Sequence, residues 1–270
     1  MHAPSPSDWF WIDEGQGYPL VLIHGFGAST FSWRANIGPL KKHYRVLAPD
    51  LPGHGRTLGE PGADYSLDGL VDGLRAGLLK RGVTRAAVGG NCFGGGLALL
   101  LAHRYPELVS HLVLLDPAAI LTRLPLFFMP LRVPLLGRLV AASLRPWILH
   151  LGLRLAYHNW NLITPEVLEG YSPTYRNAQQ RLTLWKICGQ MTFMPLRQVK
   201  TILEGIEQPT ALIWGIEDRI LPIKQGCKFF AFRPQTRPFF LLDIGHAPQE
   251  EDPEQVNKII IDFLGSALIN

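Results

Sequence analysis

The chain has 270 residues, 47% hydrophobic and 18% charged, which is ample apolar material for one large core and too little charge for a disordered chain. An α/β unit of this length commonly folds as one domain with room for an inserted subdomain. Cys92, Cys188 and Cys227 lie too far apart in sequence for a disulfide scaffold or a metal motif. Residues 1–15 lack the basic and apolar regions of a secretory signal, so we expect a cytoplasmic protein.

Strand and helix patterns alternate along much of the chain. Apolar residues at helical spacing predict helices over 67–78, 93–105 and 253–264, with Ser66 as the N-cap of the first. This alternation predicts an α/β fold, with a mostly parallel central sheet flanked by helices. The strands are predicted from short apolar runs at 20–23, 45–48, 86–89, 111–115, 211–214 and 239–242.

The alternation breaks at residues 120–208, where prolines interrupt apolar pieces that are too short to span a membrane. We therefore predict a core formed by residues 1–119 and 209–270, with 120–208 inserted as a hydrophobic helical cap. Because caps line the substrate pocket, an apolar cap favours a small lipophilic substrate. Alternatively, these apolar side chains only bury the cap against the core.

Positive charge gathers in the same insertion. The net charge is only +4, but five arginines and no acidic residue lie between Asp116 and Glu166. The arginines alternate with apolar residues instead of forming a phosphate-binding stripe, which argues against nucleic acid as a partner. The pattern instead indicates peripheral contact between the cap and an anionic membrane surface.

A candidate nucleophile follows the strand predicted at 86–89. The chain runs through Gly90-Asn91-Cys92-Phe93-Gly94 into a helix, which is G-x-C-x-G in the context where G-x-S-x-G holds a nucleophile. The sharp turn leaves no room for side chains at the two glycines, and the helix N-terminus favours a thiolate at Cys92. The competing interpretation is a small buried cysteine without chemistry.

A glycine-rich loop supports the first interpretation. His24-Gly25-Phe26-Gly27 follows the strand at 20–23, as an oxyanion loop does. The backbone N–H groups of Phe26 and Phe93 are therefore the predicted oxyanion donors. The competing interpretation of the loop is a simple turn.

A thiol nucleophile also needs a base and an acid that orients the base. His246 follows the last predicted strand, and Asp218 lies four residues beyond Trp214, in the order nucleophile, acid, histidine. We prefer Asp218 to Glu217 because it is better placed to reach His246. We expect structural roles for the other histidines considered, which are His24, His54, His103 and His111.

Four ordered motifs make the chain resemble the α/β-hydrolase family from about Trp9 to Leu264. They are the oxyanion loop at 24–27, Asp-Leu-Pro-Gly-His-Gly at 50–55, the Cys92 turn and Gly245-His246. The resemblance implies a Cys92, Asp218, His246 triad under a cap. Cysteine stands where most of the family has serine. Dienelactone hydrolases and polyhydroxyalkanoate synthases also carry a cysteine nucleophile, and an engineered exchange of serine for cysteine gives the same motif. The turn is also similar to that of meta-cleavage-product hydrolases.

We therefore expect a hydrolase that cleaves an ester or thioester of a lipophilic substrate through an acyl-Cys92 intermediate. Three alternatives stay open: an acyltransferase using the same intermediate, a carbon–carbon bond hydrolase, and a ligand-binding protein that has kept only the fold. The sequence has neither metal-ligand spacing nor a nucleotide-binding G-x-G-x-x-G with its acidic partner, so we expect no metal and no cofactor.

Overall fold

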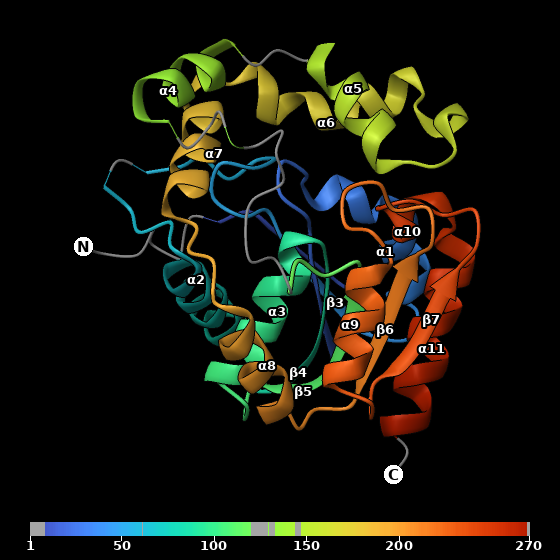
Figure 1. Ribbon diagram of the computed structural model, residues 1–270. Helices are drawn as coiled ribbons and strands as arrows, with labels where there is room; N and C mark the ends of the chain where they lie inside the picture. Colours follow the sequence, from blue (N-terminus) through green and yellow to red (C-terminus); the bar gives the residue numbers. More distant parts are fainter. Residues whose placement is uncertain (1–8, 61, 120–128, 130–132, 144–146, 269–270) are drawn as a thin grey trace.

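A seven-stranded sheet forms the centre of the protein (Figure 1). Its strands lie in the order β1-β3-β2-β4-β5-β6-β7. The computed structural model describes residues 9–60, 62–119, 129, 133–143 and 147–268. All neighbouring strands are parallel except β1, which is antiparallel to β3. The strands are β1 Trp11–Glu14, β2 Pro19–Ile23, β3 Arg45–Pro49, β4 Ala86–Asn91, β5 Val109–Leu115, β6 Thr210–Gly215 and β7 Arg237–Leu241.

The predicted fold class is confirmed, and six of these strands lie within two residues of the predicted apolar runs. The prediction missed β1, because this short edge strand buries Trp11 but exposes Asp13 and Glu14. The predicted cap of the first helix is also confirmed. Ser66 Oγ accepts a hydrogen bond from the Gly69 N–H at 3.1 Å at the start of that helix.

Helices cover both faces of the sheet. The α2, α3, α8 and α9 helices contribute to one apolar layer, and α1 and α11 to the other. The bounds of these helices, and of the short helix α10 that contacts α1 and α11, are α1 Arg34–Leu40, α2 Leu67–Lys80, α3 Phe93–Arg104, α8 Leu196–Gly205, α9 Lys224–Phe232, α10 Pro248–Glu251 and α11 Pro253–Leu268. Along β2, Val21 and Ile23 face the first layer, whereas Leu20 and Leu22 face the second, because side chains alternate along a strand.

The cap helices lie over the end of the sheet toward which the β6 and β7 arrows point (Figure 1). They are α4 Pro134–Ser143, α5 Trp147–Ala156, α6 Pro165–Arg176 and α7 Ala178–Gln190. The next helix, α8, lies lower, beside α3. The division into a 120–208 cap and a two-segment core stays a prediction. Arg123, Arg132 and Arg145 of the predicted basic cap fall outside the described residues.

Within the described part of the chain, no helix combines the length and the apolar character needed to cross a membrane.

Candidate active site

Cys92 lies in a strained turn between β4 and α3. Its φ is 50° and its ψ is −114°, in a region that side-chain-bearing residues rarely adopt. A Cβ atom on Gly90 would overlap the backbone of Gly94, and one on Gly94 would overlap the carbonyl of Ile23. The G-x-C-x-G spacing is therefore required by the close packing of three backbone segments.

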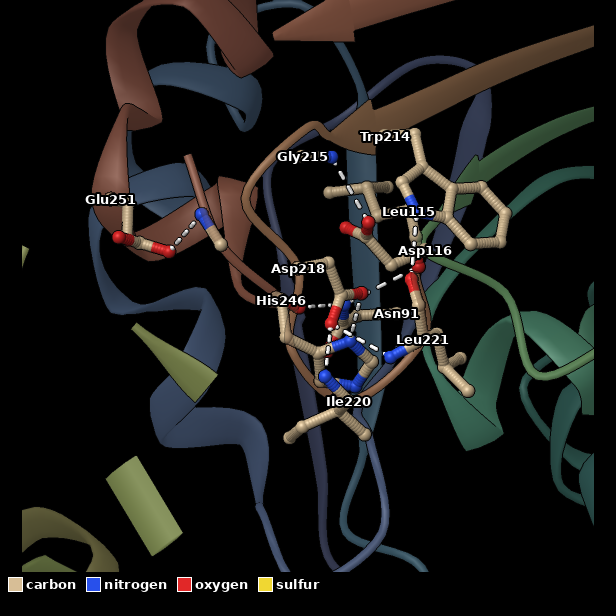
Figure 2. Close-up of polar contacts among 11 residues, drawn as sticks. Asn91, Leu115, Asp116, Trp214, Gly215, Asp218, Ile220, Leu221, His246 and Glu251 are labelled. Carbon is tan, nitrogen blue, oxygen red and sulfur yellow. Dashed lines mark hydrogen bonds and ion pairs between the residues drawn. The ribbon is translucent and has the colours of Figure 1, made fainter. Parts of the chain in front are cut away.

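Two buried side chains are joined beside this turn. His246, which follows β7, is hydrogen-bonded through Nδ1 to Asp218 Oδ2 at 2.6 Å (Figure 2). The other oxygen of Asp218 accepts hydrogen bonds from the backbone N–H groups of Ile220 at 2.7 Å and Leu221 at 2.8 Å. Three contacts thus fix the carboxylate, and Asp218, rather than Glu217, reaches the imidazole.

The surroundings of His246 favour its charged form. Burial acts to lower the pKa of His246, but the charges of Asp218 and Cys92 and their hydrogen bonds to the ring outweigh burial and hold the pKa well above its usual range. The carboxylate of Asp218 and the sulfur of Cys92 thus both raise the pKa of the imidazole.

Side-chain bonds hold the loop that carries His246. Asn91, the last residue of β4, donates from Nδ2 to the carbonyl of His246 at 2.9 Å. Glu251 accepts from the N–H of Gly245 at 2.8 Å and also from the N–H groups of His158 at 2.7 Å and Asn159 at 3.0 Å, just after the cap helix α5. These contacts tie the loop to the Cys92 turn and to the residues just after α5.

Cys92 and His246 line one largely apolar pocket of about 370 Å³ beneath the cap. Four aromatic residues of the cap line this pocket, whereas Trp160 does not. Trp160 is 48% exposed and stacks on the guanidinium of Arg154, whose carbon lies 4.2 Å from the ring centroid. The four that line it are Tyr157, Tyr171, Tyr175 and Trp185.

The two predicted oxyanion donors belong to segments that meet near Cys92. Phe93 is the first residue of α3, where an N–H has no acceptor within its own helix. Phe26 lines the pocket, and its ring packs edge-on against that of Phe93 with centroids 6.0 Å apart. Their role as donors stays a prediction.

Burial disfavours the protonated form of two histidines in the neighbouring loops. Burial lowers the pKa of His24 to about 4 and the pKa of His54 to about 3. His24 Nε2 accepts from the N–H of Leu51 at 3.0 Å, and Nδ1 of His54 contacts the carbonyl of Pro52 at 2.9 Å. Both rings therefore bind the backbone. His103 is exposed on α3, and His111 is buried in β5.

Two acidic residues near the site were not singled out from the sequence. Asp116 follows β5 directly, is fully buried and accepts from the N–H of Gly215 at 3.0 Å. Glu250 lines the pocket, binds Arg34 and accepts from the Tyr171 hydroxyl at 2.5 Å. An acidic residue directly after a buried apolar strand was an available signal for Asp116, whereas Glu250 lies in a polar run with no such mark.

Asp116, Asp218 and His246 have donor atoms that lie within 4.8 Å of one another, which is close enough to share a metal ion. The carboxylate of Asp218, however, is already engaged by two backbone N–H groups and by the imidazole. These hydrogen bonds account for its position without an ion.

The fold and site define the class of protein. A sequence model of the alpha/beta hydrolase fold matches residues 18–253, and the chain belongs to that family and is a hydrolase.

Among its relatives, the uncharacterized hydrolase YugF of Bacillus subtilis is 30% identical, over 98% of this chain and 100% of its own. The 2-hydroxy-6-oxo-6-phenylhexa-2,4-dienoate hydrolase of Burkholderia cepacia is 28% identical, over 94% of this chain and 90% of its own. Among solved structures, that of a membrane phospholipase A, described as a bacterial virulence factor, is similar with a TM-score of 0.75 and 27% identity, covering 95% of this chain and 82% of that one.

Proposed function

We propose that the protein hydrolyses an ester or thioester of a lipophilic substrate with Cys92 as nucleophile, His246 as base and Asp218 as the acid that orients the base. One observation carries the proposal. Cys92, on a strained turn, and His246, bonded at 2.6 Å to a buried Asp218, line the same apolar pocket. Nucleophile, base and orienting acid in this geometry are the requirements for acyl transfer.

In the proposed reaction, His246 takes the thiol proton and the sulfur of Cys92 adds to the acyl carbon. The N–H groups of Phe26 and Phe93 stabilise the oxyanion. Collapse of this intermediate breaks the bond to the leaving alcohol or thiol, which takes the proton from His246. Water then gives a proton to His246 and attacks the thioester, which releases the acid. His246 returns the proton to the departing sulfur and so restores the thiol of Cys92.

The pocket also favours a second fate for the acyl group. A thiolate acylates readily, but an apolar pocket holds little water for deacylation. Transfer of the acyl group to an alcohol or amine is therefore the second candidate activity. The two differ in the acceptor: hydrolysis releases free acid at a rate independent of added alcohol, whereas a transferase forms new ester in proportion to it.

Similarity to the Burkholderia cepacia relative favours a third candidate, the hydrolysis of a carbon–carbon bond in a dienoate of the kind named for that protein. Parallel assays with a vinylogous diketone acid and with medium-chain acyl esters discriminate the candidates. Faster turnover of the esters supports acyl chemistry, and faster turnover of the diketone acid supports carbon–carbon bond cleavage.

The outer surface of the cap supports membrane contact. Leu136 and Leu139 on α4 are 48% and 69% exposed, and Leu151 on α5 is 58% exposed. Arg138 and Arg154 are exposed on the same two helices, so apolar and cationic groups alternate as at a lipid interface. Leu151 also lines the pocket, which therefore opens beside this surface. The similarity to a membrane phospholipase A agrees with the proposal.

Vesicle flotation tests this contact. We expect the protein to float with vesicles rich in phosphatidylserine and to bind neutral vesicles more weakly, and Leu136→Asp with Leu139→Asp to reduce the bound fraction about tenfold. Leu79→Asp is the matched control, since Leu79 is 42% exposed on α2, away from the cap. Absence of wild-type binding to anionic vesicles contradicts the proposal, as does an equal loss in the control.

Selective alkylation tests the nucleophile. Cys92 is partly buried, Cys227 exposed and Cys188 buried, so exposure alone predicts that Cys227 reacts first with iodoacetamide. We expect Cys92 to react about tenfold faster than Cys227, because the thiolate is the reactive form. The advantage is expected to vanish in His246→Ala. Faster reaction at Cys227 contradicts an activated Cys92.

A further inference from the structure

Asp116 is a buried acid that the proposed mechanism does not use. It directly follows β5, its side chain is fully buried and its φ is 41°. Its N–H donates to the carbonyl of Ile213 at 3.0 Å, and its Oδ1 accepts from the N–H of Gly215 at 3.0 Å. Both ends of the residue are thus tied to β6, the strand that leads to Asp218, and Figure 2 shows the contact with Gly215.

Asp116 and Asp218 lie too close to be charged together without a large cost. An oxygen of each lies within 4.8 Å of the other and of a His246 nitrogen, and all three residues are buried. Two carboxylates that share a water-poor site do not both ionise readily, so one of them keeps a proton.

The hydrogen bonds indicate which carboxyl group keeps the proton. Asp218 receives three bonds, from the N–H groups of Ile220 and Leu221 and from His246, and all three stabilise its anion. Asp116 receives one bond, at Oδ1, while its buried Oδ2 receives none from the described residues. A proton on Oδ2 turns a repulsive approach to Asp218 into a hydrogen bond.

We propose that Asp116 is a positioning residue that stays protonated and donates a hydrogen bond to Asp218, so that the single negative charge of the pair remains beside His246. The inference rests on the proposed roles of Asp218 and His246. The titratable groups that face Asp116 are these two, from the loops after β6 and β7. Burial raises the pKa of Asp116 well above its usual range, and the charge of Asp218 raises it further.

Titration of the His246 ring by NMR locates the charge. The measurement uses a Cys92→Ala background, because the Cys92 sulfur also raises the pKa of His246. If Asp116 is neutral, Asp116→Asn exchanges one neutral hydrogen-bond donor for another and shifts the pKa of His246 by less than about 0.5 units. If Asp116 is charged, the same variant removes a nearby negative charge and lowers that pKa by about one unit or more, which overturns the proposal.

Asp218→Asn is the positive control for this titration and is expected to lower the pKa of His246 by about one unit or more. The titration needs no turnover, so its result is independent of whether the proposed reaction is correct. In the protein that keeps Cys92, we expect Asp116→Ala to lower kcat about tenfold with little change in KM. The Asp116→Asn variant is expected to retain most of the wild-type kcat. Equal loss in both folded variants contradicts a role through the donated hydrogen bond.

Discussion

Two regions hold their side chains in opposite ways. One is the carboxyl-terminal edge of the sheet, where Cys92 follows β4, and the other is the cap above it. At the edge, Asp218 and His246 are buried and bound to each other at 2.6 Å. On the cap, Leu139 and Leu151 are more than half exposed, and Leu151 also lines the pocket. The edge therefore depends on a few fixed polar contacts, whereas the cap depends on apolar surface. Changes at the edge should alter the reaction, and changes in the cap should alter which substrate reacts.

Removal of the nucleophile or base is the strongest test of this difference. We expect Cys92→Ala and His246→Ala each to reduce kcat with a medium-chain ester by about a thousandfold or more, because triad residues act as a unit. Cys227→Ala is the control, since Cys227 is exposed and is not among the residues that line the pocket. A reduction of less than about tenfold at Cys92 contradicts its role as nucleophile.

Asp218→Asn should have the next largest effect, lowering kcat about a hundredfold or more. The amide cannot supply the charge that outweighs the effect of burial on His246, so the pKa of His246 should fall. The imidazolium that forms when His246 takes the proton of Cys92 is then less stable, and the pH dependence of activity shifts with that pKa. The pH dependence of kcat/KM checks this, and an unchanged profile in Asp218→Asn argues that its charge does not act through His246.

A substitution in the cap should change the selectivity for acyl chain length. Val140, on α4, lines the pocket, and Val140→Trp narrows it from the side of the cap. We expect about tenfold lower kcat/KM for long acyl esters and little change for acetyl esters, because only the long chains need that volume. Rates measured across a series of chain lengths check this. An equal loss for every chain length indicates that the cap and edge are not separable.

The smallest effect is expected for Glu251, whose hydrogen bonds join the two regions. Glu251 accepts three backbone hydrogen bonds, from Gly245 and from two residues after α5. Glu251→Ala leaves these donors without a partner, and we expect it to lower the free energy of unfolding by about 2 kcal/mol. Urea unfolding measures this. Lys200→Ala is the control, because its pairing with Glu204 is exposed and contributes less than about 0.5 kcal/mol.

The core was predictable from sequence because its strands are uninterrupted apolar runs. The run at 86–89 and the two glycines around Cys92 predict a strand, a sharp turn and a helix, all of which the structure contains. The edge strand β1 was not predictable in the same way, since Asp13 and Glu14 break its apolar pattern.

The directions of cap side chains were not predictable either. Tyr157 and Trp160 are only three residues apart, yet Tyr157 is buried in the pocket wall and Trp160 stacks outside on Arg154. Sequence spacing does not distinguish them, because the turn after α5 reorients the chain between the two. Asp116 carries a local signal, as an acidic residue directly after a buried strand, but its closeness to Asp218 joins residues about a hundred positions apart in sequence, which local patterns do not report.

Intact-mass spectrometry after mixing with medium- and long-chain acyl esters and thioesters tests the central claim most directly. The account predicts one acyl adduct, mapped to Cys92, that is absent from Cys92→Ala and does not form in His246→Ala. An adduct mapped to Cys188 or Cys227, or turnover of acyl donors that persists in Cys92→Ala, contradicts it.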